Sequence, residues 1–138
     1  MEIKFFAAVK AFIKFQDKVL ILRESRNYVD GSNVGRFDVV GGRVKPGERF
    51  DESLLREIKE ETGLAVKIGR PFFMSEWRPV VKGEQWHIVG TFIECFADTD
   101  KVVLSEDHEE FLWINPKDYG SYNLIENLGA AFECYLSK

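Results

Sequence analysis

Apolar residues in the first forty positions are arranged as in β-strands. Residues 3–15 are rich in β-branched and aromatic side chains, and residues 18–23 are largely aliphatic. The polar pair between these two segments offers a turn, so together they predict a β-hairpin. A polar, turn-rich stretch at 24–35 then leads to a further short strand at 37–40. Binding residues are common in long loops of this kind.

Helical patterning occurs twice, at 46–63 and at 121–137. Good helix formers fill the first segment and a glycine ends it, whereas the second carries apolar residues at helical spacing. Between the two helices, residues 65–77, 85–96 and 111–114 predict strands. Both alternating faces of the middle strand are apolar, so we expect it to be a central strand that is covered on each side.

These elements predict one domain. No repeat, low-complexity tract or linker divides them. A chain of 138 residues, 45% of them hydrophobic and 14% aromatic, is long enough to bury its own core. We therefore expect a single domain over residues 1–138, with a mixed β-sheet between helices, in the α/β or α+β class.

Charge and cysteine content narrow the class of partner. The chain has 19 Lys and Arg against 23 Asp and Glu, a formal net charge of −4. This balance removes the general electrostatic basis for binding a long nucleic acid. The apolar run at 5–9 is too short for a secretory signal or a membrane span. Cys95 and Cys134 lie far apart, which favours reduced core thiols in a cytoplasmic protein. A ligand must therefore be held by a local site.

Acidic residues gather on one side of the first predicted helix. At about 100° per residue, Glu57, Glu60 and Glu61 fall within an arc of roughly 100°. That arc borders the apolar one instead of lying opposite to it, and the apolar arc is formed by Phe50, Leu54, Leu55 and Ile58. Carboxylate oxygens on a rigid helix suit Mg²⁺ or Mn²⁺. The alternative is a solvated helix whose glutamates are neutralised by Lys59 and Arg56.

The stretch from 41 to 64 resembles the Nudix box. In that pattern a glycine, five residues, a glutamate and seven residues precede Arg-Glu-aliphatic-x-Glu-Glu-x-Gly-aliphatic. Every specified position is matched here, by Gly42, Glu48, Arg56, Glu57, Ile58, Glu60, Glu61, Gly63 and Leu64. Val40 stands where the commonest form of the family has proline, a departure that concerns loop shape more than metal ligation.

The resemblance implies a fold and a reaction. The fold is a Nudix-type α/β/α sandwich with a mixed β-sheet and the Nudix loop-helix-loop. The reaction is a Mg²⁺-dependent hydrolysis, with Mn²⁺ as the alternative metal, that cleaves the diphosphate bond of a nucleoside diphosphate linked to another group. The resemblance makes Glu57, Glu60 and Glu61 the catalytic metal ligands, with the main-chain carbonyl of Gly42 beside them. Glu57 also occupies the position often assigned to the base.

Three further residues match family positions. Arg56 and Glu48 correspond to residues that orient the glutamates through a salt bridge. Asp107 precedes His108 in a segment that resembles the one carrying a further ligand or base before a tryptophan. An ordinary acidic surface loop is the alternative for this segment.

Nucleotide-binding candidates are arginines, aromatic residues and an acid near the strand ends. They are Arg23, Arg26, Phe37, Asp38, Trp77 and Trp86. A core or solvated position is the alternative for each of them. Pro79 matches a proline that some ADP-ribose pyrophosphatases of the family carry, although a turn explains it equally well.

The resemblance leaves the substrate open between an ADP-ribose-like compound and a nucleoside triphosphate. The alternative function is a Nudix module that binds and senses a nucleotide without cleaving it. Since dimers are common in the family, a homodimer is a further expectation.

Overall fold

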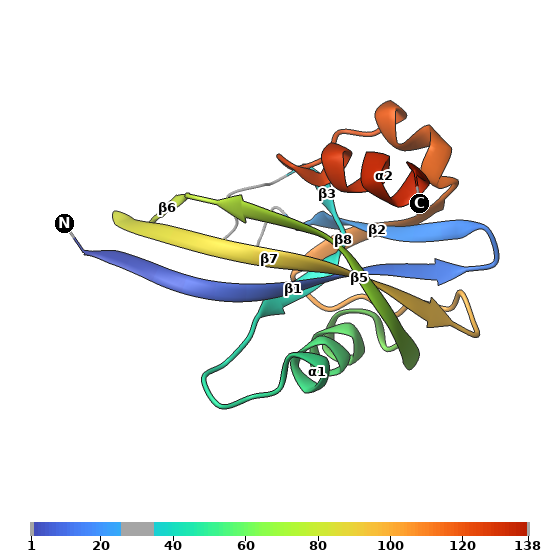
Figure 1. Ribbon diagram of the computed structural model, residues 1–138. Helices are drawn as coiled ribbons and strands as arrows, with labels where there is room; N and C mark the ends of the chain where they lie inside the picture. The colour runs from blue at the N-terminus through green and yellow to red at the C-terminus, as the bar shows by residue number, and fades with distance from the viewer. Residues whose placement is uncertain (1, 26–34, 138) are drawn as a thin grey trace.

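Residues 2–25 and 35–137 are described by a computed structural model, in which eight strands form one sheet (Figure 1). The strands are β1 (Ile3–Phe15), β2 (Lys18–Glu24), β3 (Phe37–Asp38), β4 (Val40–Arg43), β5 (Val66–Trp77), β6 (Val80–Val81), β7 (Glu84–Ala97) and β8 (His108–Ile114). The helices are α1 (Phe50–Thr62), the 3₁₀ helix η1 (Pro116–Ser121) and α2 (Leu128–Ser137). Because α1 and α2 lie on opposite faces of the sheet, the predicted α/β/α sandwich is confirmed.

The strand order is β3-β2-β1-β7-β5, with β4 paired to β1, β6 to β7 and β8 to β2. Strands β1 and β7 run parallel, from Ile3 opposite Gln85 to Lys14 opposite Phe96. Since β7 lies between β1 and β5, the expectation of a central strand there is confirmed. Strands β1 and β2 pair only next to their turn, and β4 pairs with the middle of β1. This pairing brings the box glycines into the sheet.

Alternation along β1 divides the core into two clusters. Ala11 and Ile13 pack toward α1, with the fully buried Leu54 and Ile58. Phe12 points the other way, into a cluster with side chains of α2 such as Leu128 and Phe132. The apolar arc predicted on the first helix is only half correct, because Phe50 and Leu55 are 55% and 42% exposed.

Helix α1 begins later than the pattern predicts. Gly47 has a φ of 85°, and the Glu48 amide donates to the Lys45 carbonyl, so residues 45–48 form a turn. Gly63 ends the helix as expected: its φ of 74° is left-handed, and its amide donates to the Lys59 carbonyl.

The predicted helix at 121–137 is wrong in its first half. The Phe37 amide donates to the Asn123 carbonyl, and the Ile125 amide donates to the Phe37 carbonyl. These two hydrogen bonds pair the segment with β3 in an extended conformation, and α2 begins only at Leu128. A tertiary contact therefore overrides the helical spacing of the apolar residues.

Both cysteines are free, Cys95 buried and Cys134 partly buried. Burial raises the pKa of the Cys95 thiol to about 12, so this side chain stays protonated at neutral pH. No helix in the described parts of the chain is long and apolar enough to cross a membrane.

Candidate active site

The glutamates of the acidic helix face line a cavity of about 420 Å³ between α1, β4 and the loop before β8. The side chains of Glu61 and Glu57 are mostly buried, at 13% and 18% exposure, whereas that of Glu60 is 60% exposed. The cavity is lined by Glu24, Asp38, Val39, Gly41, Gly42, Arg43, Glu57, Glu60, Glu61, Ser105, Asp107 and His108. We call this space the carboxylate cavity.

Gly42 allows the Glu57 carboxylate to lie against the backbone of β4. A Cβ atom at Gly42 would lie 2.5 Å from Glu57 Cδ and 2.6 Å from Glu57 Oε1. The absence of a side chain at position 42 therefore determines where this carboxylate lies, and it places the main-chain atoms of Gly42 at the cavity wall.

Arg56 holds the acids of the box in place. Its Nε and Nη2 donate to the two oxygens of Glu48, at 3.0 and 3.1 Å, in a bidentate pair. Its Nη1 donates to Glu57 Oε1 at 2.9 Å and lies 3.5 Å from Glu60 Oε2. The hydrogen bonds from Arg56 lower the pKa of Glu48 to about 2, so the pair stays ionised at neutral pH. This is the geometry that the sequence analysis predicts for Glu48 and Arg56.

We expect Glu48→Gln to lower kcat by about 10- to 100-fold with little loss of stability, because Arg56 would lose one charged partner and hold Glu57 less firmly. Steady-state kinetics and urea unfolding of the variant check this. The matched control is Asp51→Asn, which also loses one arginine contact but lies on the exposed side of the same helix. An unchanged kcat in Glu48→Gln would show that Arg56 positions Glu57 without its ion pair to Glu48.

Glu61 is the most buried acid of the cavity. Burial, together with the negative charge of Glu57, raises its pKa to about 9. Its Oε2 atom is buried and accepts no hydrogen bond from the described residues. His108 Nδ1 lies 3.5 Å from Glu61 Oε1, and burial lowers the pKa of this imidazole, so His108 offers no positive charge at neutral pH. A cation bound beside Glu61 would favour the ionised form of this group.

The donor atoms of the cavity fit a hard divalent cation. No three Asp, Glu, His or Cys side chains in residues 2–25 and 35–137 are already arranged to hold a metal ion, and Arg56 is bonded to Glu57 and Glu60. Carboxylates nonetheless predominate among the polar side chains that line the cavity, and Glu61 Oε2 is buried without a hydrogen-bond donor. This is the donor chemistry that Mg²⁺ and Mn²⁺ take.

A loop anchored on the end of α1 contributes the far wall of the cavity. The Val103 amide donates to the Thr62 carbonyl at 2.9 Å, and the Ser105 amide donates to the Glu61 carbonyl at 3.3 Å. These bonds bring the exposed Asp107 and the partly buried His108 to the cavity. Asp107 therefore lines the carboxylate cavity, and its role as a further ligand stays a prediction.

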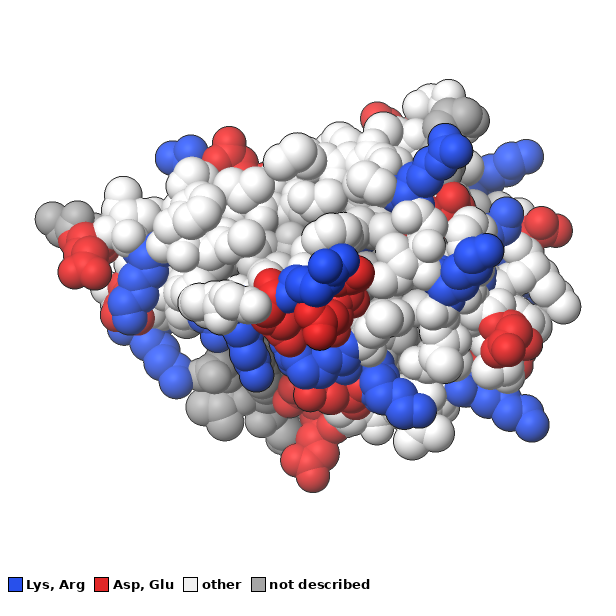
Figure 2. Space-filling view, turned by 60° about the horizontal axis from the view of Figure 1, so that its bottom comes forward, with Lys and Arg blue, Asp and Glu red and all other residues white. Residues whose placement is uncertain are grey.

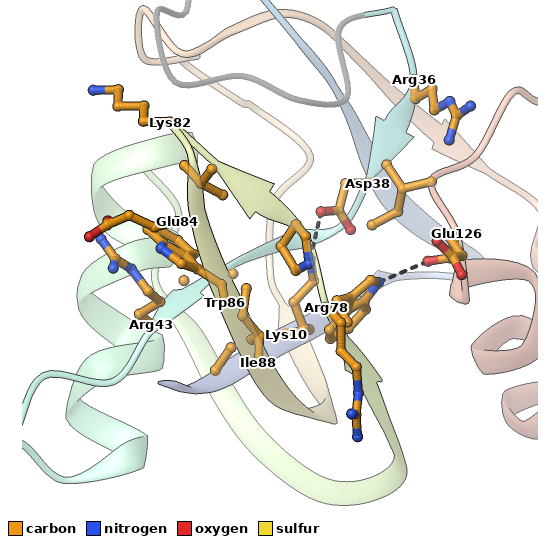
Figure 3. Close-up of a pocket in the computed structure, with 17 residues that line it drawn as sticks. Lys10, Arg36, Asp38, Arg43, Arg78, Lys82, Glu84, Trp86, Ile88 and Glu126 are labelled. Carbon is orange, nitrogen blue, oxygen red and sulfur yellow. Dashed lines mark hydrogen bonds and ion pairs between the residues drawn. The ribbon is translucent and has the colours of Figure 1, made fainter. Parts of the chain in front are cut away.

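A second, larger cavity of about 690 Å³ lies on the sheet face opposite α1 (Figure 3). Ala8 on β1 lines its floor and lies in register with Gly90 on β7. Trp77 rests on Gly90, where a Cβ atom would lie 2.5 Å from the ring, and its indole N–H donates to the Glu126 carbonyl. The lining is Ala8, Lys10, Arg36, Asp38, Gly41, Gly42, Arg43, Trp77, Arg78, Pro79, Val81, Lys82, Glu84, Trp86, Ile88, Ile125 and Glu126. We call it the aromatic cavity.

An ion pair lies at the inner end of the aromatic cavity. Lys10 Nζ lies 2.5 Å from Asp38 Oδ2, and both side chains are largely buried (Figure 3). The same ammonium lies 5.4 Å from the centroid of the Trp77 ring. Asp38 belongs to both cavities, so the pair stands where the two cavities meet.

The structure brings together only part of the predicted nucleotide-binding set. Asp38, Trp77 and Trp86 line the aromatic cavity, as does Pro79. Phe37 lies outside both cavities, because it is buried in the core at 8% exposure. Arg23 also lies outside them, and its guanidinium is 3.7 Å from both Glu109 and Glu110. Arg26 falls outside the described residues.

Several of the cavity residues are not named as candidates in the sequence analysis, namely Lys10, Glu24, Arg36, Arg43, Arg78 and Ser105, and His108 is named there only as the neighbour of Asp107. For Lys10 a signal exists, since a lysine interrupts an otherwise apolar strand. The others lie on segments that are brought together only by the tertiary fold.

Charges of both signs alternate on the face that carries α1. Figure 2, which turns this side toward the viewer, shows red and blue side chains next to one another near the centre. On this helix Arg56 pairs with acids of the box and Arg49 pairs with Asp51. Among the described residues this face therefore has no continuous basic surface for a long polyanion.

Comparisons with known proteins match this architecture. The family model of the NUDIX domain matches residues 4–132. Nucleoside triphosphatase NudI of Escherichia coli K12 is 30% identical over 97 residues, which cover 65% of this chain and 69% of the relative. The NudI protein of Escherichia fergusonii is 29% identical over the same shares of the two chains. The crystal structure of a MutT protein from Methanosarcina mazei Go1 is 26% identical, with a TM-score of 0.84 over 99% of this chain and 96% of that one.

The family match covers nearly the whole described chain, and three glutamates of the box, Glu57, Glu60 and Glu61, line one cavity beside a second cavity that is lined by aromatic residues and cations. The chain therefore belongs to the NUDIX domain family and is a hydrolase that acts on pyrophosphate bonds.

Proposed function

We propose that the chain is a Mg²⁺-dependent nucleoside triphosphate pyrophosphohydrolase, which releases a nucleoside monophosphate and pyrophosphate. One observation carries the proposal: the aromatic cavity and the carboxylate cavity share Asp38, Gly41, Gly42 and Arg43. A nucleoside in the first cavity would extend its phosphates directly into the second. The name of the NudI relatives, nucleoside triphosphatase, supports the choice of a triphosphate over an ADP-ribose-like substrate.

The aromatic cavity fits a nucleoside. Trp77 offers a ring that is held in place by its hydrogen bond to Glu126 and by contact with Gly90. Stacking on such a ring is tolerant of base identity. The Lys10–Asp38 pair supplies a donor and an acceptor beside that ring, with which base edges form hydrogen bonds.

Glu57 and Glu61 would hold the divalent cation, together with Glu60, Asp107 and the carbonyl of Gly42. When bound, the cation supplies charge neutralisation for the phosphate oxygens and lowers the pKa of water. Mn²⁺ accepts the same oxygen ligands.

The chain's own residues then supply position and proton acceptance. Arg56 fixes the orientation of Glu57 through their 2.9 Å hydrogen bond. Glu57 is our candidate for the proton acceptor, because its carboxylate lies at the cavity wall against Gly42. Arg43 places positive charge near the entering phosphates.

A nucleotide panel with Mg²⁺ tests the proposal by its products. Release of a monophosphate and pyrophosphate from at least one nucleoside triphosphate, abolished by EDTA, is the expected result. Release of a sugar phosphate from ADP-ribose in preference to any triphosphate would replace our substrate with the alternative one. Tight nucleotide binding without any product would instead identify the sensor module. Such modules commonly lack one of the box glutamates, whereas all three are present in this chain.

We expect Gly90→Ala to raise the KM for the nucleotide severalfold while kcat changes little, because the new methyl group would displace the Trp77 ring from the cavity floor. Steady-state kinetics with the best substrate of the panel check this. Gly120→Ala is the control, because a Cβ atom there meets nothing within 4 Å. A change in kcat alone would contradict a role for Trp77 in nucleoside binding.

Two expectations from the sequence stay predictions, the cytoplasmic location and the homodimer. Cell fractionation and sedimentation at several protein concentrations would test them.

A further inference from the structure

One cation at the junction of the two cavities is held by aromatic rings. The guanidinium carbon of Arg43 lies 4.5 Å from the centroid of the Phe6 ring and 4.8 Å from that of the Trp86 ring. The two rings pack against each other, with centroids 4.7 Å apart. Figure 3 shows Arg43 and Trp86 together on one side of the aromatic cavity, across from Asp38.

Arg43 forms no ion pair with the described residues. Other arginines of the chain do: Arg56 binds Glu48 and Arg78 binds Glu76. The nearby Glu84 is 2.7 Å from Lys4. Contact with aromatic rings orients a guanidinium without occupying the N–H groups at its edge, which remain available to an anion.

Arg43 lies at the junction of the two cavities, where the N–H groups of its guanidinium can reach a phosphate. Arg43 is one of the four residues that both cavities share, and it is the one cation among them. Of the described residues, six acids line the carboxylate cavity: Glu24, Asp38, Glu57, Glu60, Glu61 and Asp107. A phosphate chain that enters from the aromatic cavity approaches these negative charges, and it does so past Arg43.

We propose that Arg43, held by the Phe6 and Trp86 rings, is the phosphate-binding residue of this chain and determines its preference for nucleotides over nucleosides. Its planar fork donates two hydrogen bonds to phosphate oxygens as they pass the junction. The inference rests on the proposed function for the identity of the ligand.

Titration of inorganic tripolyphosphate into the protein in Mg²⁺, followed by tryptophan fluorescence, tests the role without a nucleoside and without turnover. We expect Arg43→Ala to weaken tripolyphosphate binding by about tenfold or more, since a charged hydrogen-bond partner is lost. Arg43→Lys should recover only part of the affinity, because it restores the charge but not the planar fork. The control is Arg70→Ala, which removes an exposed arginine that lines neither cavity.

Nucleoside affinity is the second readout. Arg43→Ala should leave the affinity for the corresponding nucleoside unchanged, whereas a variant that disturbs the fold would weaken both ligands. Equal tripolyphosphate affinity in wild type and Arg43→Ala, or equal losses for the two ligands, would overturn the inference and leave the hydrolase proposal standing. Arg43-dependent tripolyphosphate binding by a protein that cleaves no nucleotide would support the inference and overturn the proposed function.

Discussion

Glu61→Gln is expected to lower kcat by at least about a hundredfold, because it replaces the most buried carboxylate of the cavity with a neutral amide that binds a divalent cation poorly. The amide has nearly the same shape as the carboxyl group, so the fold should be retained. The control is Glu52→Gln, an exposed glutamate of the same helix that lines neither cavity. Activity near the wild-type level in Glu61→Gln would show that the Glu61 carboxylate is not required for hydrolysis.

The same substitution should change the pH dependence of stability in EDTA. Burial raises the pKa of Glu61 to about 9 from an ordinary value of 4.5. As pH rises from 4.5 to 9, the unfolded chain therefore releases a proton that the folded chain retains. Glu61 therefore lowers the free energy of unfolding progressively as the pH rises from 4.5 to 9. We expect urea midpoints at pH 5, 7 and 9 to fall less steeply in Glu61→Gln than in wild type. Parallel curves would contradict the burial of this carboxylate.

Gly42→Ala is expected to lower kcat by about a hundredfold while stability changes little. The new methyl group would overlap the Glu57 carboxylate, whose Cδ atom lies 2.5 Å from the Cβ position. Since the far end of a flexible side chain moves easily, Glu57 would turn away and the backbone would remain in place. Kinetics and thermal unfolding, measured together, separate the two effects.

Gly120→Ala again supplies a matched comparison, since it adds the same methyl group where nothing lies within 4 Å. Unfolding of Gly42→Ala at a much lower temperature than wild type would show that the strand moves instead of the side chain. Full activity in a stable Gly42→Ala would show that the position of Glu57 is not critical.

Elements with strong local periodicity could be predicted from the sequence. The spacing of Glu57, Glu60 and Glu61 is fixed by a single helix, so their common face follows from the helical repeat alone. Segments that a distant partner controls could not be predicted in this way. Residues 122–127 have apolar spacing typical of a helix, but the main chain of Asn123 and of Ile125 forms hydrogen bonds with Phe37.

The residues of the aromatic cavity were predictable only in part for the same reason. The aromatic cavity combines β1, β3, β4, β5, β6 and β7, and the position of Trp77 over its floor depends on Gly90, which lies in register with Ala8. The register of two parallel strands far apart in the chain is not encoded in local patterning. Phe37 illustrates the ambiguity of a single aromatic residue, since its side chain contributes to the core.

The loop that carries Asp107 and His108 is attached to the main chain of α1, through the carbonyls of Thr62 and Glu61. The amide protons that form these bonds belong to Val103 and Ser105, and neither residue is part of the acidic cluster. Their hydrogen exchange with solvent reports whether the end of α1 and the loop open together. These two backbone protons therefore offer an NMR signal for the integrity of the site that requires neither substrate nor turnover.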